Sequence, residues 1–278
     1  MSWDLVTEDL VRPEAPCPDD DDAIWCSDIF GDGAILRVQL DGSLEQLCTR
    51  AHVGGMVPHA DGGVVASGHD LAVVSRDGEQ RAVLAADDIW GYNDITTDFA
   101  GRVFAGRHDE APKIDPPERD PSLWRLGADG EAVFCYGDLT MNNGLRVSPD
   151  GARLYHADTL RKVIWVSDLD ADGMPSNRRV HHELRIAMPD GMAIDEHECL
   201  WIAAVGGGAI VRVTPDGAED AVIEVPRTYV SAVCFSGADR RELVVTAFGG
   251  EPYDAEHSGC VLRRRADVAG LPLTPALV

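Results

Sequence analysis

The sequence predicts an all-β fold, a six-bladed β-propeller with four antiparallel strands in each blade. The dipeptide Asp-Gly occurs nine times, mostly between short runs of Val, Ile, Leu and aromatic residues, which is typical of β-hairpins. No ten-residue window shows convincing amphipathic helix periodicity. One hairpin type recurs six times, with starts separated by 41, 38, 50, 47 and 41 residues. A repeat of roughly 40–50 residues that holds four short strands is the signature of a propeller blade.

Each repeat begins with a polar or small residue, followed by a short strand, a turn and a second strand. The six repeats start at Glu14, Gly55, Asn93, Asn143, Asp190 and Ser231. A third strand follows in every repeat, at residues 34–38, 70–74, 122–126, 163–167, 209–213 and 259–263. Five of these third strands run into a turn that contains Asp-Gly, so a fourth strand is expected beyond the turn. The outer strand of the sixth repeat is weak, and residues 3–6 are expected to supply it and close the ring. The prediction is one propeller domain over residues 1–278.

The charge balance excludes several classes of partner. Against 24 Lys and Arg stand 48 Asp and Glu, a net charge of −24, while 45% of the residues are hydrophobic and provide for a core. Such an acidic surface repels phosphate backbones and anionic headgroups, so neither nucleic acid nor a membrane surface is expected as a partner. The start of the chain lacks the basic and apolar regions of a signal peptide, which favours a cytoplasmic location. Seven scattered cysteines without a C-x-x-C motif argue against a disulfide framework and a structural zinc site.

The starts of the innermost strands are the predicted place for chemistry. These strands line the central channel of a propeller, so their first residues converge on one mouth. Four of the six starting residues are carboxylates or carboxamides, namely Glu14, Asn93, Asn143 and Asp190. Oxygen donors around one axis suit a hard divalent cation such as Ca²⁺ or Mg²⁺. Asn and Asp are also common turn residues, so turn chemistry is the alternative explanation from the residues alone.

Four segments also carry a family resemblance. The stretch from Asn143 to Asp158 resembles the motif N-G-L-x-x-S-P-D-G-x-x-L-Y-x-x-D of the SMP-30/gluconolactonase/luciferin-regenerating family. Residues 189–195 with 199–203, residues 93–106, and residues 13–28 are similar to three further motifs of that family. The similarity runs in order over nearly the whole chain.

The resemblance implies a six-bladed propeller of metal-dependent lactonases and related hydrolases. It implies one divalent metal ion held by Glu14, Asn143 and Asp190, and a substrate contact at Asn93. Family members accept Ca²⁺, Zn²⁺, Mg²⁺ or Mn²⁺, and a set of oxygen donors without histidine favours Ca²⁺. Asp190 is also the expected catalytic base toward a water that the metal activates, and Asn93 is expected to hydrogen-bond a substrate oxygen.

One departure from the family concerns the substrate. Aldonolactonases of the family carry Arg two residues before the substrate Asn, where this chain has Gly91. The loss removes a fork of donors suited to a polyhydroxylated substrate. This change argues against specificity for a sugar lactone. The acidic surface, separately, disfavours highly anionic substrates and points to a neutral lactone or ester.

Further residues are candidates for substrate contacts. His108 and His69 follow the second strands of the third and second repeats, on the same face as Asn93, and are expected to contact substrate. The acidic, Pro-rich stretch 109–121 is a candidate lid or a solvated loop. His156 is expected to be a structural histidine.

Two other classes of function stay open at this stage. One is an enzyme that uses the same metal site on another ester or enol ether, or an isomerase or cyclase of a natural-product pathway. The other is a non-catalytic propeller that binds a ligand or a protein. No G-x-S-x-G motif occurs, which disfavours catalysis by a nucleophilic serine.

Overall fold

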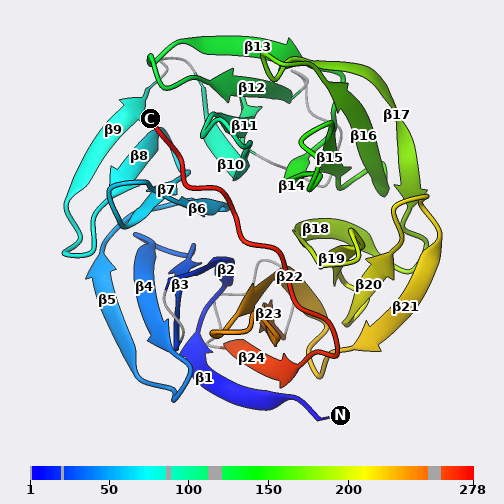
Figure 1. Ribbon diagram of the computed structural model, residues 1–278. Helices are drawn as coiled ribbons and strands as arrows, with labels where there is room; N and C mark the ends of the chain where they lie inside the picture. Colours follow the sequence, from blue (N-terminus) through cyan, green and yellow to red (C-terminus); the bar gives the residue numbers. More distant parts are fainter. Residues whose placement is uncertain (1, 20–21, 86–88, 112–120, 250–257) are drawn as a thin grey trace.

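The computed structural model describes residues 2–19, 22–85, 89–111, 121–249 and 258–278, and these residues form strands and turns without a helix (Figure 1). The strands are grouped in fours around a central axis, and the pairing within each group is antiparallel; one bridge, between Val205 and Tyr229, joins the last two groups into an eight-stranded sheet. The predicted all-β propeller is therefore confirmed. The described residues contain no helix of the length and apolarity needed to cross a bilayer.

The first three blades are regular four-stranded sheets, each ordered from the axis outward in chain order. Blade one consists of β2 (Pro13–Pro18), β3 (Ala23–Asp28), β4 (Ala34–Gln39) and β5 (Leu44–Cys48). Blade two consists of β6 (Met56–Pro58), β7 (Val64–Ala66), β8 (Leu71–Val74) and β9 (Gln80–Leu84). Blade three consists of β10 (Gly91–Thr97), β11 (Val103–His108), β12 (Ser122–Leu126) and β13 (Ala132–Tyr136).

The other three blades complete the ring. Blade four consists of β14 (Asn142–Val147), β15 (Arg153–Asp158), β16 (Val163–Leu169) and β17 (Pro175–Glu183). Blade five consists of β18 (Met188–Ile194), β19 (Leu200–Val205), β20 (Ala209–Val213) and β21 (Glu219–Glu224). Blade six takes β22 (Tyr229–Ser236), β23 (Glu242–Phe248) and β24 (Gly259–Arg265) from the end of the chain, and β1 (Asp4–Leu10) from its beginning.

The ring is closed by the pairing of β1 with β24. The two strands are antiparallel, with Asp4 opposite Arg263 and Leu10 opposite Gly259. The prediction that the beginning of the chain supplies the outer strand of the sixth blade is confirmed, and the strand extends further than residues 3–6. Joining the two ends of the chain in one blade ties the first and last blades together by backbone hydrogen bonds.

The hydrophobic core lies between the blades. Each of six buried clusters in the described residues joins two neighbouring blades, and together they pass around the whole ring. Trp25 and Met56, for example, belong to the cluster between blades one and two, and Trp201 and Phe235 to that between blades five and six. All seven cysteines are free, and five of them are buried. The fold therefore rests on packing between sheets and contains no disulfide.

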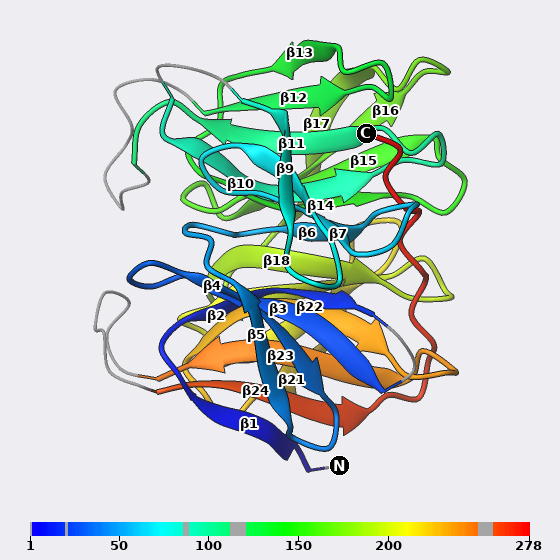
Figure 2. The ribbon, with the colours of Figure 1, turned by 90° about the vertical axis from the view of Figure 1, so that its left-hand side faces the viewer.

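Residues near the axis of the ring are more buried than residues at its rim, and this determines where a functional site can lie. The innermost strand β2 is buried at five of its six residues, whereas the outermost strand β5 has no buried residue. The inner strands β2, β6, β10, β14, β18 and β22 surround the channel and run in one direction along it (Figures 1 and 2). Their first residues therefore meet at one end of the channel and their last residues at the other.

The segment after β24 crosses the second end of the channel. In Figure 1 it passes over the centre of the ring from blade six toward blade two, and in Figure 2 it runs along one face. Its backbone hydrogen bonds join Leu271 to Ile194, Leu277 to Gly101, and Ala276 to Pro58. The first end of the channel, where the predicted site lies, is the end opposite this segment.

Candidate metal centre

Four of the predicted site residues share one cavity. A hollow of about 380 Å³ opens at the first end of the channel, and Glu14, Asn93, Asn143 and Asp190 all line it. Each comes from a different inner strand, β2, β10, β14 and β18 respectively. The other two repeat starts, Gly55 and Ser231, do not line it. Ser231 instead donates a 2.8 Å hydrogen bond from Oγ to the Pro13 carbonyl and so joins the inner strands of blades six and one.

A break in strand pairing occurs at each of these four residues. The register shifts lie between Glu14 and Cys17, Tyr92 and Ile95, Asn142 and Leu145, and Pro189 and Met192. Such bulges insert an extra residue into one strand and redirect the side chains near it. Ala15, which follows Glu14, has a positive φ of 52° that fits this local distortion. The bulges allow polar side chains on buried strands to turn toward the channel.

Asn143 is held in one orientation by its neighbours. Its Nδ2 donates a 2.8 Å hydrogen bond to Oγ1 of Thr159, whose hydroxyl donates at 2.9 Å to the Pro189 carbonyl. With the amide nitrogen engaged on one side, the amide oxygen faces Asn93, which donates to it from Nδ2 at 2.8 Å. An amide oxygen has two lone pairs, so one remains for a further partner in the cavity.

Asn93 uses both of its N–H groups within the protein. The second N–H donates a 2.6 Å hydrogen bond to the Asn142 carbonyl. The amide oxygen of Asn93 is therefore the group left for substrate, and it is an acceptor only. In this arrangement Asn93 suits a hydroxyl of a substrate, and has no N–H left for a carbonyl oxygen.

Two buried carboxylates face the same cavity. Glu14 and Asp190 are 7% and 8% exposed, respectively. Burial raises the pKa of Glu14, an effect opposed by the Arg12 guanidinium, whose Nε lies 3.8 Å from Glu14 Oε1. Burial and the negative charge of Glu14 raise the pKa of Asp190 well above its ordinary value. Two buried carboxylates that repel each other form a pair that a bound cation would stabilise.

These donors fit a hard cation. Two carboxylates and one amide oxygen form an oxygen-only set of the kind that Ca²⁺ and Mg²⁺ prefer. The residues that the structure describes contain no cluster of three His, Cys, Asp or Glu side chains able to hold a metal ion. A site here therefore depends on the amide oxygen of Asn143 as the third protein ligand, with the remaining positions open to water and substrate.

The walls of the cavity come from the residues that enter the inner strands. Arg12, His52, Trp90 and Met141 each lie shortly before an inner strand and line the cavity, and Met188 is the first residue of β18. Turns between later strands add Ile29, Phe30, Thr159 and Leu160. Most of these side chains are apolar, so the cavity has a polar floor at the predicted ligands and largely apolar walls.

The two histidines predicted to contact substrate lie next to this wall and do not line the cavity. His108 is 2% exposed, and its ring centroid is 6.2 Å from that of Trp90. His69 is exposed, and its Nδ1 lies 2.7 Å from the Trp90 carbonyl oxygen. Neither lines the cavity, whereas Trp90 and His52 do, with their ring centroids 4.8 Å apart. Direct contact of the two histidines with substrate therefore stays a prediction. It would require a substrate that extends past Trp90.

Sequence reasoning missed the wall residues and the support of Asn143. The wall residues could have been found from their position in the sequence, because Trp90 and His52 precede inner strands, as Arg12 does. His156 is fully buried, with Nδ1 2.9 Å from the Tyr136 hydroxyl, which agrees with the structural role expected for it. Of the candidate lid at 109–121, residues 112–120 lie outside the described part of the chain.

Comparison with known proteins places the chain in a family. A model described as the SMP-30/gluconolactonase/LRE-like region matches residues 12–249. The chain belongs to this family. The 6-deoxy-6-sulfogluconolactonase of Pseudomonas putida is 32% identical to this chain over 245 residues. The match covers 83% of this chain and 82% of that relative. Regucalcin of Danio rerio is 30% identical over 237 residues, covering 82% and 79% of the two chains.

Solved structures agree on the fold of this SMP-30/gluconolactonase/LRE-like protein. A luciferin-regenerating enzyme superposes with a TM-score of 0.87 over 99% of both chains, at 21% sequence identity. At this identity the likeness concerns the fold alone.

The backbone around Gly91 explains why this position holds no side chain. Its φ is +152°, and a Cβ at this position would lie 2.4 Å from the Gly68 carbonyl oxygen. Tyr92 and Gly68 exchange backbone hydrogen bonds of 2.7 and 3.3 Å, which fixes this approach between blades two and three. No side chain fits at position 91 without a shift of the backbone.

Proposed function

We propose that this protein is a divalent-metal-dependent lactonase, which opens a neutral lactone or related cyclic ester by hydrolysis. The observation that carries the proposal is the convergence of Glu14, Asp190 and the oriented amide oxygen of Asn143 in one cavity of about 380 Å³. The relatives named as a lactonase and as regucalcin support it. The proposed ion is Ca²⁺, because every protein donor is a hard oxygen.

The residues have distinct parts in the proposed reaction. Glu14, Asn143 and Asp190 would hold the ion, which supplies Lewis acidity toward an ester carbonyl and toward water. Asp190 would take the proton of the attacking water as the new C–O bond forms. It would return that proton to the ring oxygen as the ester C–O bond breaks. The amide oxygen of Asn93 would accept a hydrogen bond from a substrate hydroxyl and so orient the ring.

The apolar walls support a substrate with an apolar substituent. Trp90, Phe30 and Leu160 present hydrocarbon surface to the cavity. At Gly91 no guanidinium is available for the hydroxyls of a sugar lactone. We therefore infer a lactone that carries an alkyl or aryl group in preference to an aldonolactone.

The test combines metal analysis with hydrolysis of a matched pair of lactones. Purified protein is expected to contain or bind Ca²⁺ and to hydrolyse an alkyl-substituted γ-lactone faster than gluconolactone, and a chelator should stop both reactions. Asp190→Ala should abolish metal binding and hydrolysis together, whereas Asp216→Ala, in an exposed turn of blade five, should change neither. Hydrolysis that persists in Asp190→Ala with metal bound would refute the role of Asp190. Bound metal without hydrolysis of any lactone would refute the lactonase proposal.

A further inference from the structure

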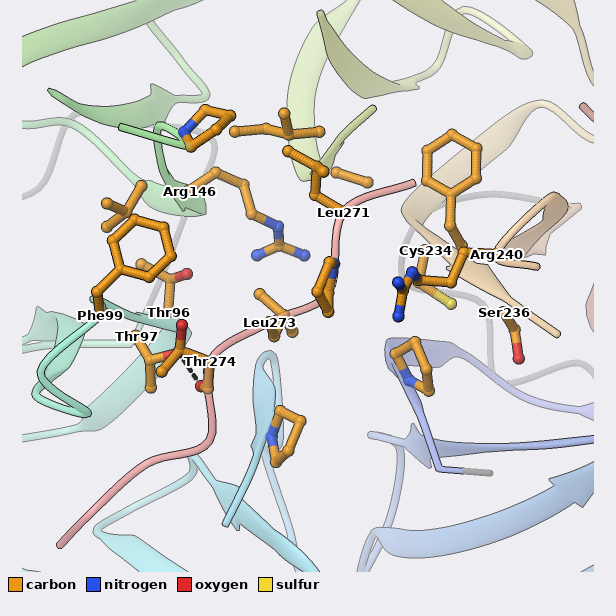
Figure 3. A pocket seen from close by; sticks show the side chains of 18 of the residues that line it. Thr96, Thr97, Phe99, Arg146, Cys234, Ser236, Arg240, Leu271, Leu273 and Thr274 are labelled. Carbon is orange, nitrogen blue, oxygen red and sulfur yellow. Dashed lines mark hydrogen bonds between the residues drawn. The ribbon is translucent and has the colours of Figure 1, made fainter. Parts of the chain in front are cut away.

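A second cavity lies at the opposite end of the channel. It has a volume of about 410 Å³ and is formed where the inner strands end, at Thr96 and Thr97 of β10, Arg146 and Val147 of β14, and Ser236 of β22 (Figure 3). Residues 271–274 of the segment that crosses this face form part of its wall. None of the proposed metal ligands lines it.

The crossing segment is fixed in place on both sides of the cavity. On one side the Leu271 N–H donates a 2.9 Å hydrogen bond to the Ile194 carbonyl of blade five. On the other side the Thr97 hydroxyl donates to the Thr274 carbonyl of the segment, and the Ala276 N–H donates at 2.7 Å to the Pro58 carbonyl. These bonds hold the wall at a set distance from the ends of the inner strands, so the cavity is a built feature of the fold.

A guanidinium points into the middle of this cavity. Arg146 projects from the inner strand β14 toward the crossing segment, with its head near Leu271 and Leu273 (Figure 3). The one hydrogen bond recorded for it among the described residues runs from Nη1 to the Leu145 carbonyl at 2.6 Å. A guanidinium has five N–H donors, so several of them face the cavity without a protein acceptor. Arg240 reaches toward the same space from the side of blade six (Figure 3).

A buried hydroxyl independently indicates a ligand. Thr96 lines the cavity, is 0% exposed, and has no hydrogen-bond partner for its Oγ1 in the structure. A buried hydroxyl without a partner is unfavourable by about 1–3 kcal/mol, so such groups are normally satisfied by protein, water or ligand. Thr96 and Arg146 line the same cavity, and a carboxylate has two oxygens that can accept from a hydroxyl and a guanidinium together.

The surrounding charges favour a ligand with a single negative charge over a polyanion. Asp19 also lines the cavity, but its carboxylate already accepts hydrogen bonds from Arg37 at 2.6 Å and Arg76 at 3.0 Å. Asp94 is the acid whose charge acts on Arg146, and one of its oxygens accepts a 2.7 Å hydrogen bond from the Ile95 N–H. Asp94 offsets part of the positive charge of Arg146, and the whole chain carries a net charge of −24. A polyanion would therefore be repelled.

Much of the remaining wall is hydrocarbon. Leu271, Leu273, Phe235, Val147 and Phe99 line the cavity around the two arginines. We propose that this cavity is a second binding site, which takes a small organic monocarboxylate with an apolar body through Arg146 and the Thr96 hydroxyl. The proposal does not depend on the lactonase activity, because no residue of the metal centre takes part in it.

Calorimetric titration with benzoate tests the site. Benzoate joins a carboxylate to an apolar ring, and benzamide is its neutral counterpart. Wild-type protein should bind benzoate at least about tenfold more tightly than benzamide, because hydrogen bonds to a charged group are the stronger ones. Arg146→Gln should weaken benzoate binding at least about tenfold, and Thr96→Val, which keeps shape and charge, by about 3–10-fold. Asp190→Asn, at the other end of the channel, should change it by less than about twofold.

Several outcomes would overturn the proposal. They are the absence of benzoate binding to wild type up to about 10 mM, equal binding of benzamide, and loss of binding in Asp190→Asn with retention in Arg146→Gln. Binding of inorganic phosphate in preference to benzoate would also overturn it, since the site would then not select an apolar body. Circular dichroism establishes that each variant is folded. If Arg146→Gln does not fold, the Thr96→Val result decides.

Discussion

The amide nitrogen of Asn93 donates a 2.8 Å hydrogen bond to the amide oxygen of Asn143, and so joins the inner strands of blades three and four at the mouth of the channel. The same oxygen of Asn143 is the proposed third ligand for a cation. A substrate contact and a metal ligand are therefore coupled through one hydrogen bond, and the orientation of Asn143 depends in turn on Thr159. The first prediction follows from this chain of contacts.

Thr159→Val should weaken metal binding without removing a ligand. The substitution keeps the shape of the side chain but deletes the hydroxyl that accepts from Asn143 Nδ2 at 2.8 Å and donates to the Pro189 carbonyl. Without it the amide of Asn143 keeps the hydrogen bond from Asn93 but loses the one to residue 159, and loss of such supporting hydrogen bonds typically reduces metal affinity by about 10–100-fold. Calcium titration by calorimetry measures the effect. Thr97→Val is the matched control, because Thr97 is an equally buried threonine at the other end of the same channel. Equal calcium affinity in Thr159→Val and wild type would contradict the proposed role of Asn143.

Trp90→Ala should reduce hydrolysis of apolar lactones selectively. Trp90 is the largest apolar side chain in the wall of the metal-side cavity, and it packs against His52 at 4.8 Å between ring centroids. Removing a large apolar contact of about 1.5–3 kcal/mol corresponds to a decrease of about 10–100-fold in kcat/KM for an alkyl- or aryl-substituted lactone. An unsubstituted lactone should be affected much less. Trp124→Ala is the control, since Trp124 is a partly buried tryptophan of blade three that packs on Phe134 and does not line the cavity. An equal decrease in kcat/KM for both substrates would mean that the substituent does not bind against Trp90.

The sequence was sufficient for the fold because the repeat is regular. Asp-Gly turns and short apolar runs recur with a spacing that only a ring of blades accommodates, and even the closure by the beginning of the chain follows from the missing strand. It also located Glu14, Asn93, Asn143 and Asp190 at one mouth of the channel. It could not show that both N–H groups of Asn93 are occupied, because this depends on a hydrogen bond between blades that are 50 residues apart.

The walls of the cavity were harder to predict, because most of their residues lie before or between strands, outside any alternating pattern. Alternation along a strand assigns side chains to two faces, but the bulges at Glu14 and at the other inner strands break that alternation where the site is formed. His69 and His108 follow their strands on the expected face, yet neither lines the cavity, and both rings contact Trp90, which does. The second cavity was not foreseen either, because it depends on residues 271–274 crossing the end of the channel.

Gly91→Ala should destabilise the fold, which accounts for the missing arginine. A methyl group at position 91 would lie 2.4 Å from the Gly68 carbonyl oxygen, and the φ of +152° is unfavourable for any side chain. Gly62→Ala is a matched control, because Gly62 also has a positive φ, +94°, but nothing lies within 4 Å of a Cβ there. We expect Gly91→Ala to lower the free energy of unfolding by about 1–3 kcal/mol more than Gly62→Ala, as measured by urea denaturation. Equal effects of the two substitutions would mean that the contact with Gly68 relaxes easily. An arginine at position 91 would then be sterically possible.

His156→Gln should reduce the loss of stability in acid. Burial lowers the pKa of His156 to about 3, whereas an unfolded histidine titrates near pH 6.5. Between these values the unfolded chain binds a proton that the folded chain does not, so the free energy of unfolding falls as the pH falls below about 6.5. The slope from this one residue approaches 1.4 kcal/mol per pH unit, or roughly 1.5–2 kcal/mol between about pH 6.5 and 5. Urea denaturation of wild type and His156→Gln at both pH values isolates it, because contributions of other groups cancel in the comparison. His156→Gln will be less stable than wild type at neutral pH if it loses the contact with the Tyr136 hydroxyl at 2.9 Å, but its stability should depend less on pH. An unchanged dependence would show that His156 takes up its proton in the folded protein as readily as in the unfolded chain.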